Sequence, residues 1–302
     1  MPRTTLALTS FVSGELGSKL DGRTDFAKYN TGAKTLENFL IHPQGSATRR
    51  VGTQFIAEVK DSTKKTRLIP FEFSTVQTYV LEFGNQYMRV YKDKGQVQSG
   101  GSAFELATPY LEAELFEIKF AQSADVLFIC HPNHAARKLA RTGHTSWTLT
   151  EIDFTDGPYL SPNATSTTLT PSGTTGSVNI TASASTFAAT DVGRLVSFSS
   201  GRAKITGFTS ATVVAATTQV DFANTNAVTD WKLGAFSGTT GHPSCVSFFE
   251  QRLVFAGTLA EPQTLYFSKS GDYENMTTGT NADDAMVYTI ASNQVNRIRY
   301  LK

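Results

Sequence analysis

The feature that most constrains the fold of this chain is an approximate repeat of paired apolar segments. Leu127 and Leu139 lie in two segments joined by a loop with one proline, and Leu253 and Leu265 lie in two further segments joined in the same way. The two leucines of each pair are separated by the same number of residues. Repeated antiparallel β units of this kind predict β-propeller blades.

Local periodicity predicts further strands and one short helix. Residues 79–83 and 87–91 alternate between apolar and polar side chains on either side of a Gly-Asn turn, which predicts a β-hairpin. The segment 125–130 is apolar on both faces, as in a strand that is buried on both sides. After Pro109, apolar residues at helical spacing predict a two-turn helix that ends before Phe120.

Changes in composition divide the chain into four parts. Residues 1–59 contain many glycines and no helical periodicity, which predicts an extended arm that packs on a neighbouring surface. Residues 60–160 form a β-rich, propeller-like part, and the Ser/Thr-rich residues 161–230 form a small inserted β domain. Residues 231–302 form a second blade-like part, which we expect to continue in a longer protein. The predicted fold class is therefore mainly β, with antiparallel propeller-type units, an inserted β domain and an N-terminal arm.

The charge balance argues against a nucleic-acid clamp. The chain has 27 Lys and Arg against 26 Asp and Glu, so it lacks the excess of cations that neutralises phosphates. It also contains no apolar run of about 18 residues, and we therefore expect no membrane span. The two cysteines, Cys130 and Cys245, are too few for a disulfide framework, so we expect both to be free and buried.

The sequence contains no recognisable catalytic motif, and we expect neither an enzyme nor a bound cofactor. Cys130, His131 and His134 resemble a metal cluster, but they are fewer than four ligands. On a strand, Cys130 and His131 point to opposite faces and cannot chelate together without a turn at Pro132. We therefore interpret this group as structural and expect no metal. The acidic residues 112, 114 and 117 are interpreted as an exposed helix face.

Short motifs that occur in a fixed order along the chain indicate a family. They are FVSGEL (11–16), LDGRTD (20–25), RRVGT (49–53), RLIPFEFS (67–74), LEFG (81–84), TPY (108–110), FAQSAD (120–125), DGPY (156–159), WKLG (231–234), QRL (251–253) and SKSGD (268–272). Together they resemble the tail nozzle proteins of short-tailed bacteriophages, also called tail tubular protein B. The resemblance covers nearly the whole chain except the Ser/Thr-rich insert. Val51 departs from the family pattern, in which proline follows the paired arginines.

The resemblance implies a structural virion protein, assembled in the host cytoplasm and located in the phage tail. Such a protein forms a hexameric ring under the head-to-tail adaptor ring, with tail fibres or spikes as further partners. The ring acts as an assembly platform and as a conduit for DNA ejection, and DNA passes through it without specific binding. Family members are longer than this chain and include a propeller-like region.

The arm supplies the candidate assembly contacts, because an aperiodic segment that cannot bury itself needs a neighbouring subunit. These candidates are Phe11, Gly14, Glu15, Gly22, Arg23, Asp25, Tyr29, Arg49 and Arg50. The alternative function is a propeller that binds or hydrolyses host surface polysaccharide. The blade-like repeat and the abundant aromatic residues motivate it, although aromatic side chains also fill any β core.

Overall fold

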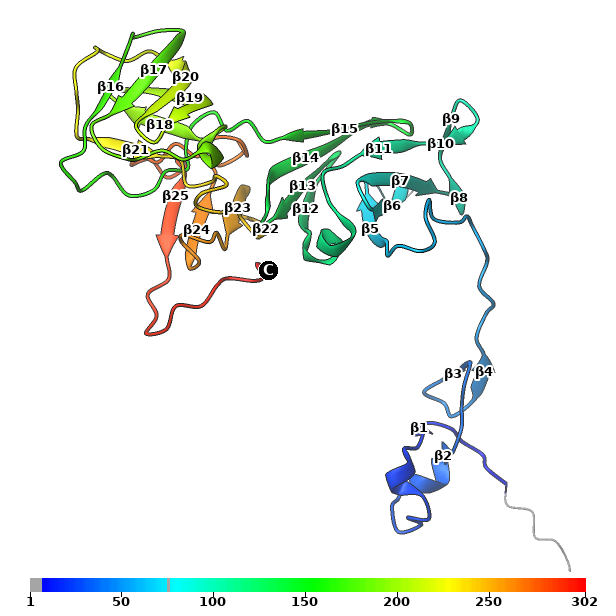
Figure 1. Cartoon of the computed structure of the whole chain (residues 1–302). Helices are drawn as coiled ribbons and strands as arrows, with labels where there is room; N and C mark the ends of the chain where they lie inside the picture. Colours follow the sequence, from blue (N-terminus) through cyan, green and yellow to red (C-terminus); the bar gives the residue numbers. More distant parts are fainter. Residues whose placement is uncertain (1–6, 75–76) are drawn as a thin grey trace, which may run out of the picture. The chain divides into compact units, whose positions relative to one another are not determined.

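The computed structural model describes residues 7–74 and 77–302 and divides the chain into two compact units, Met1–Ile56 and Ala57–Lys302. Almost all of its regular structure is β-strand, as Figure 1 shows, and the mainly β prediction is confirmed. The first six residues of the predicted arm lie outside the described residues. No helix in the described part of the chain is long and apolar enough to cross a membrane.

The first unit consists of short elements joined by turns. Strand β1 (Gly14–Glu15) pairs in parallel with β2 (Gly32–Ala33), and β3 (Phe39–Ile41) pairs antiparallel with β4 (Ala47–Arg49). Two 3₁₀ turns lie between β1 and β2, namely η1 (Ser18–Leu20) and η2 (Tyr29–Thr31). Within residues 7–56, the only buried residues are two glycines, Gly32 and Gly45. This unit therefore has no apolar core of its own.

The second unit contains three antiparallel meander sheets, the first of five strands and the other two of four. The first sheet contains β5 (Arg67–Glu72), β6 (Thr78–Gly84), β7 (Tyr87–Lys92) and β11 (Glu105–Ala107), and β8 (Gly95–Gln96) also pairs with β7. Between β8 and β11 along the chain, β9 (Gln98–Ser99) and β10 (Ser102–Ala103) form a separate small hairpin. The second contains β12 (Lys119–Ser123), β13 (Val126–His131), β14 (His134–Gly143) and β15 (Ser146–Glu151). The third contains β22 (Cys245–Phe249), β23 (Arg252–Ala256), β24 (Thr264–Phe267) and β25 (Met286–Thr289).

The repeat noted in the sequence occupies equivalent places in two of these sheets. Both copies supply the second and third strands of a meander, as β13 with β14 and as β23 with β24. The register differs between them: Leu127 pairs with Leu139, whereas Leu265 pairs with Ala256. The predicted hairpin of β6 and β7 is also confirmed, with Gly84 paired to Tyr87.

Strand β13 lies between two cores, as its apolar sequence on both faces predicted. Leu127 and Ile129 belong to a core shared by the first and second sheets. Phe128 and Cys130 belong to a second core, shared by the second and third sheets. Alternate side chains of a strand point to opposite faces, so this one strand connects the packing of all three sheets. Cys130 and Cys245 are free and buried, as expected.

The predicted helix before Phe120 is present as a 3₁₀ helix, η3 (Glu112–Glu117), so the expected spacing of Leu111, Leu115 and Ile118 does not hold at its start. Leu115 and Ile118 are fully buried, whereas Leu111 is exposed and caps the helix. In a 3₁₀ helix, residues three apart lie above one another. Leu115 and Ile118, which are three residues apart, therefore lie on one side of the helix. Leu111 precedes the first turn of the helix and does not share this buried side.

The Ser/Thr-rich segment forms a six-stranded antiparallel sheet with its own apolar core. Its spatial order is β16 (Leu169–Pro171), β17 (Ser177–Ala182), β20 (Val213–Val220), β19 (Gly201–Ser210), β18 (Leu195–Phe198) and β21 (Trp231–Leu233). Strand β21 pairs with β18, so this sheet continues three residues beyond the expected boundary at residue 230. A 3₁₀ turn, η4 (Ala189–Asp191), precedes β18.

A buried ion pair fixes the start of β18. Arg194 Nη1 lies 2.9 Å from Asp191 Oδ1, and both side chains are almost fully buried. Arg194 Nε donates to the Gly234 carbonyl, and Asp191 Oδ2 accepts from the Ala188 N–H. Because both charges have further hydrogen-bond partners, the pair offsets part of the cost of removing them from water.

Candidate functional site

Three of the nine predicted contact residues, Phe11, Glu15 and Arg50, form hydrogen bonds within the first unit. Phe11 N–H donates to the Gly45 carbonyl at 2.8 Å, and Glu15 Oε2 accepts from the Leu36 N–H at 2.9 Å. Arg50 Nε donates to Asn38 Oδ1 at 2.7 Å. Each of these bonds joins segments that are distant along the chain. They give the unit a defined shape although it has no apolar core.

The other predicted contacts are turn residues or exposed side chains. Gly14 and Gly22 adopt positive φ angles of 68° and 74°, a backbone conformation that glycine adopts most easily. Arg23 and Asp25 form an exposed, bidentate ion pair, and hydrogen bonding from Arg23 lowers the pKa of Asp25. Tyr29 begins η2 and is half-buried, whereas Arg49 ends β4 and is exposed. Their role in assembly stays a prediction.

The sequence analysis did not single out the most unusual surface of this unit, which is strand β3. All three of its residues, Phe39, Leu40 and Ile41, are exposed, and Leu40 is 57% exposed. Strand β3 pairs only with β4 in the described residues, so its outer edge keeps unpaired N–H and carbonyl groups. Three consecutive apolar residues in a polar, Gly-rich segment were the available signal. Six further large apolar side chains of the unit are exposed: Leu8, Val12, Phe26, Val51, Phe55 and Ile56.

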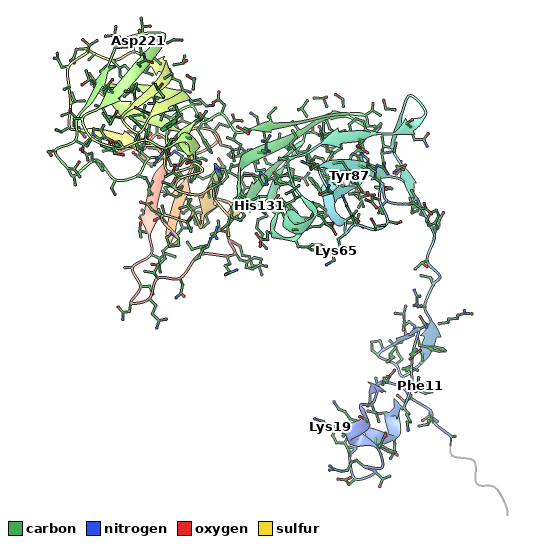
Figure 2. All side chains as sticks on the ribbon, viewed as in Figure 1. Phe11, Lys19, Lys65, Tyr87, His131 and Asp221 are labelled. Carbon is green, nitrogen blue, oxygen red and sulfur yellow. The ribbon has the colours of Figure 1, made fainter. Side chains whose placement is uncertain are left out.

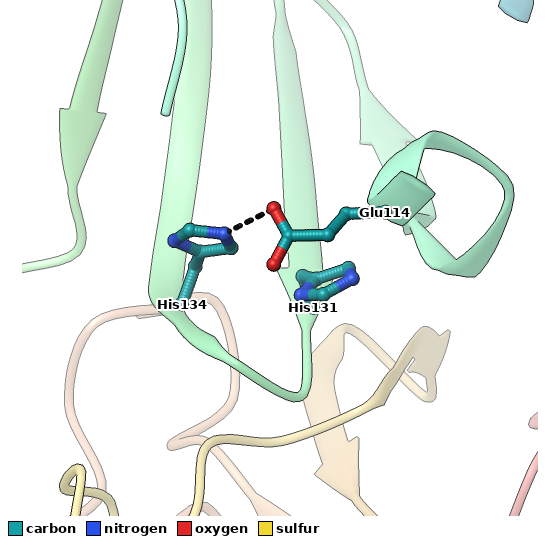
Figure 3. Close-up of side chains that lie close together, drawn as sticks. All are labelled: Glu114, His131 and His134. Carbon is teal, nitrogen blue, oxygen red and sulfur yellow. Dashed lines mark hydrogen bonds and ion pairs between the residues drawn. The ribbon is translucent and has the colours of Figure 1, made fainter. Parts of the chain in front are cut away.

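A second candidate site lies in the second unit, where η3 meets the hairpin of β13 and β14. His131 and His134 close this hairpin as directly paired residues on either side of a Pro-Asn turn. Paired residues of an antiparallel hairpin project to the same face. Glu114, from η3, points its carboxylate at the two imidazole rings (Figure 3). The potential ligand atoms of the three side chains all lie within 4.8 Å of one another.

Hydrogen bonds fix the carboxylate of Glu114. His134 Nε2 lies 2.8 Å from its Oε2, which also accepts from the Leu111 N–H at 2.9 Å. Asn133 Nδ2 donates to its other oxygen at 3.2 Å. Partial burial opposes ionisation, but the bonds from Leu111, His134 and Asn133 outweigh it and lower the pKa of Glu114 to about 2. The cluster therefore holds a carboxylate at neutral pH.

His131 is the deepest member of the cluster. Figure 2 marks its place in the second unit, and its side chain is completely buried. Burial lowers the pKa of His131, so the ring is neutral near pH 7. Its Nδ1 accepts from the Asn133 N–H at 3.2 Å, which places the ring proton on Nε2.

Two buried polar atoms at this cluster lack a hydrogen-bond partner among the described residues. They are Nε2 of His131 and the hydroxyl oxygen of Tyr110. The Tyr110 ring contacts both imidazoles, with centroid distances of 6.1 Å to His131 and 5.3 Å to His134. Buried polar groups are nearly always paired, so two unpaired groups at one point are unusual.

Sequence reasoning found only part of this cluster. It correctly placed Cys130 and His131 on opposite faces of their strand, since Cys130 belongs to the core of the second and third sheets. It named His131 and His134 but did not join them to Glu114, which it assigned to an exposed face. Glu114 in fact points inward, and its carboxylate accepts hydrogen bonds from Asn133 and His134 at the end of the β13–β14 hairpin.

Neither a family model nor a curated protein matches this chain.

Proposed function

We propose that this chain is a structural virion protein that forms the tail nozzle ring of a short-tailed bacteriophage. In this role the ring lies under the adaptor ring, serves as an assembly platform and conducts DNA out of the particle. The observation that carries the proposal is the first unit, which has defined turns and hydrogen bonds but no apolar core. It exposes nine large apolar side chains, and the outer edge of β3 is not paired with any described strand. A surface of this kind needs a partner to cover it.

The second unit supports the proposal through its repeated architecture. Three antiparallel meander sheets, one of five strands and two of four, lie in this unit, and each adjacent pair shares an apolar core. Four-stranded antiparallel sheets packed in series are the units from which β-propellers are built. The near-equal numbers of cations and anions are compatible with a wall that DNA passes without being held. Virion location, the adaptor, and fibres or spikes as partners follow from the proposed role.

The first test replaces one exposed side chain of β3. Leu40→Lys puts a charge at the centre of this strand, and because Leu40 is not packed within its unit the chain should still fold. We expect the variant to fail to enter tail particles. Val192→Lys is the matched control, since Val192 is 50% exposed on the inserted domain. Normal incorporation of Leu40→Lys would contradict the proposed contact.

The second test removes the whole first unit. A chain that begins at residue 57 retains all three meanders and the inserted sheet. We expect it to remain soluble but to be absent from purified tails. Tails that assemble normally with the shortened chain would refute a role of the first unit in assembly.

One observation favours the alternative function, a propeller that binds or hydrolyses surface polysaccharide. Phe249, Phe267 and Tyr288 form a row of edge-to-face contacts on the third meander, with centroid distances of 6.2 and 6.1 Å. Phe249 and Tyr288 are more than half exposed, as are aromatic side chains that stack on sugars. Retention of the protein on immobilised host glycan, or released oligosaccharide, would favour this function over the structural one.

A further inference from the structure

We propose that Glu114, His131 and His134 form a binding site for a divalent cation of the zinc type. Imidazole and carboxylate are ligands that zinc accepts in proteins. The three side chains come from η3, from the end of β13 and from the start of β14. A cation at this point would therefore connect η3 to the hairpin of the second meander. The inference is independent of ring assembly, because it concerns the inside of one chain.

The backbone places the two histidines in a suitable arrangement. His131 and His134 are paired across a two-residue turn, so their side chains leave the same face of the hairpin. The ring centroids are 5.2 Å apart, and the potential ligand atoms of all three residues lie within 4.8 Å of one another. Metal–ligand bonds of about 2 Å can span this cluster after a small movement of the side chains.

Glu117 is available as a further ligand. Its Oε2 lies 3.7 Å from Nε2 of His131, and its side chain is 65% exposed and so is able to move. Glu114 and Glu117 lie three residues apart on η3, which brings both to one side of a 3₁₀ helix. With Glu117 the donor set becomes two imidazoles and two carboxylates. Four ligands are the usual number at a structural zinc site.

The observation that points to a ligand is the unpaired Nε2 of His131. This nitrogen is completely buried and has no hydrogen-bond partner in the described part of the chain. The backbone of Glu114 lies beside the ring but does not meet hydrogen-bond geometry. Once its proton has moved to Nδ1, a bond from Nε2 to a cation would satisfy the atom.

Binding requires a defined rearrangement of protons. The Nε2 proton of His131 moves to Nδ1, which then gives up the hydrogen bond from the Asn133 N–H. The Nε2 proton of His134 likewise moves to Nδ1, and Nε2 exchanges its hydrogen bond with Glu114 for a bond to the metal. With both protons on Nδ1, the two metal-bound imidazoles are neutral ligands, and the carboxylate of Glu114 supplies negative charge. No oxidant or other co-reactant is involved.

The test is a metal titration of the purified full-length chain without an affinity tag. After treatment with EDTA and removal of the chelator, Co²⁺ is added and its visible absorption is recorded, and Zn²⁺ is then added as a competitor. We expect about one saturable equivalent per chain, displaced by Zn²⁺. Glu114→Gln, His131→Gln and His134→Gln should each lower the affinity by at least about tenfold.

His42→Gln is the matched control, because His42 is an exposed histidine of the first unit. It should bind Co²⁺ as the unchanged chain does. His134 is only partly buried, so His134→Gln gives a folded variant even if the change at buried His131 disturbs folding, and circular dichroism checks this. The proposal is overturned if the unchanged chain shows no saturable binding. It is also overturned if folded His134→Gln binds normally, or if His42→Gln loses binding to the same extent.

Discussion

The unpaired hydroxyl of Tyr110 allows a sharp test of the packing in the second unit. Tyr110 and Tyr79 belong to the same apolar core and are 0% and 2% exposed. The Tyr79 hydroxyl oxygen lies 2.6 Å from Nδ1 of His144 and accepts from Arg141 at 3.3 Å, whereas that of Tyr110 has no protein partner in the described residues. Replacement by phenylalanine removes one oxygen atom from each site. The two changes should therefore have opposite signs.

The magnitudes follow from the cost of burying a polar group. A buried hydroxyl without a partner costs about 1 to 3 kcal/mol, so Tyr110→Phe should raise the free energy of unfolding by about 1 kcal/mol. Tyr79→Phe removes the hydrogen bonds with His144 and Arg141 and should lower the free energy of unfolding by about 1 kcal/mol or more. Urea unfolding in EDTA, followed by the fluorescence of Trp147 in the same core, measures both. If Tyr110→Phe destabilises the protein as much as Tyr79→Phe does, its hydroxyl has a partner and the reasoning is wrong.

Two further predictions concern the backbone and the charges of the second unit. Gly241 and Gly271 both have positive φ, but a Cβ on Gly241 would lie 2.8 Å from a backbone nitrogen, whereas one on Gly271 would meet nothing within 4 Å. Gly271→Ala should lower the free energy of unfolding by about 1 kcal/mol through backbone strain alone, and Gly241→Ala should lower it by about 2 kcal/mol more because of the added clash; thermal unfolding measures both. For the charges, burial raises the pKa of Glu105, but hydrogen bonds from Lys60 and Arg89 lower it below 4.5 overall. The contribution of Glu105 to stability is therefore present above pH 4.5 and lost as the pH falls through the lowered pKa. In Glu105→Gln, the free energy of unfolding should fall less steeply as the pH is lowered below 4.5.

Local patterns in the sequence predicted the elements whose structure depends on near neighbours. The hairpin of β6 and β7 needed only alternation and a turn, and β13 needed only a run of apolar residues. The order of strands in the inserted sheet was not predictable in this way. There β17 pairs with β20 and β18 pairs with β21, which brings together segments separated by long stretches of chain. Such pairings depend on the packing of the whole domain.

The His-Glu-His cluster shows the same limit at a candidate site. The pairing of His131 with His134 was accessible, because a two-residue Pro-Asn turn places them opposite one another. The approach of Glu114 was not, since it depends on where a 3₁₀ helix places this side chain beside the β13–β14 hairpin. In the first unit, the Phe39–Ile41 segment was visible in the sequence, but the exposure of all three side chains was known only from the structure.

In the proposed function, the exposed apolar side chains of the first unit are covered only when it contacts other subunits of a tail ring. Electron microscopy of the full chain, alone and mixed with the adaptor protein of the proposed tail, tests it most directly. If the proposed function is right, we expect a closed ring of six copies, in which β3 and the exposed apolar side chains of residues 7–56 are covered by a neighbouring subunit or by the adaptor. A chain that stays monomeric with the adaptor present, or a ring in which β3 faces solvent, would contradict it.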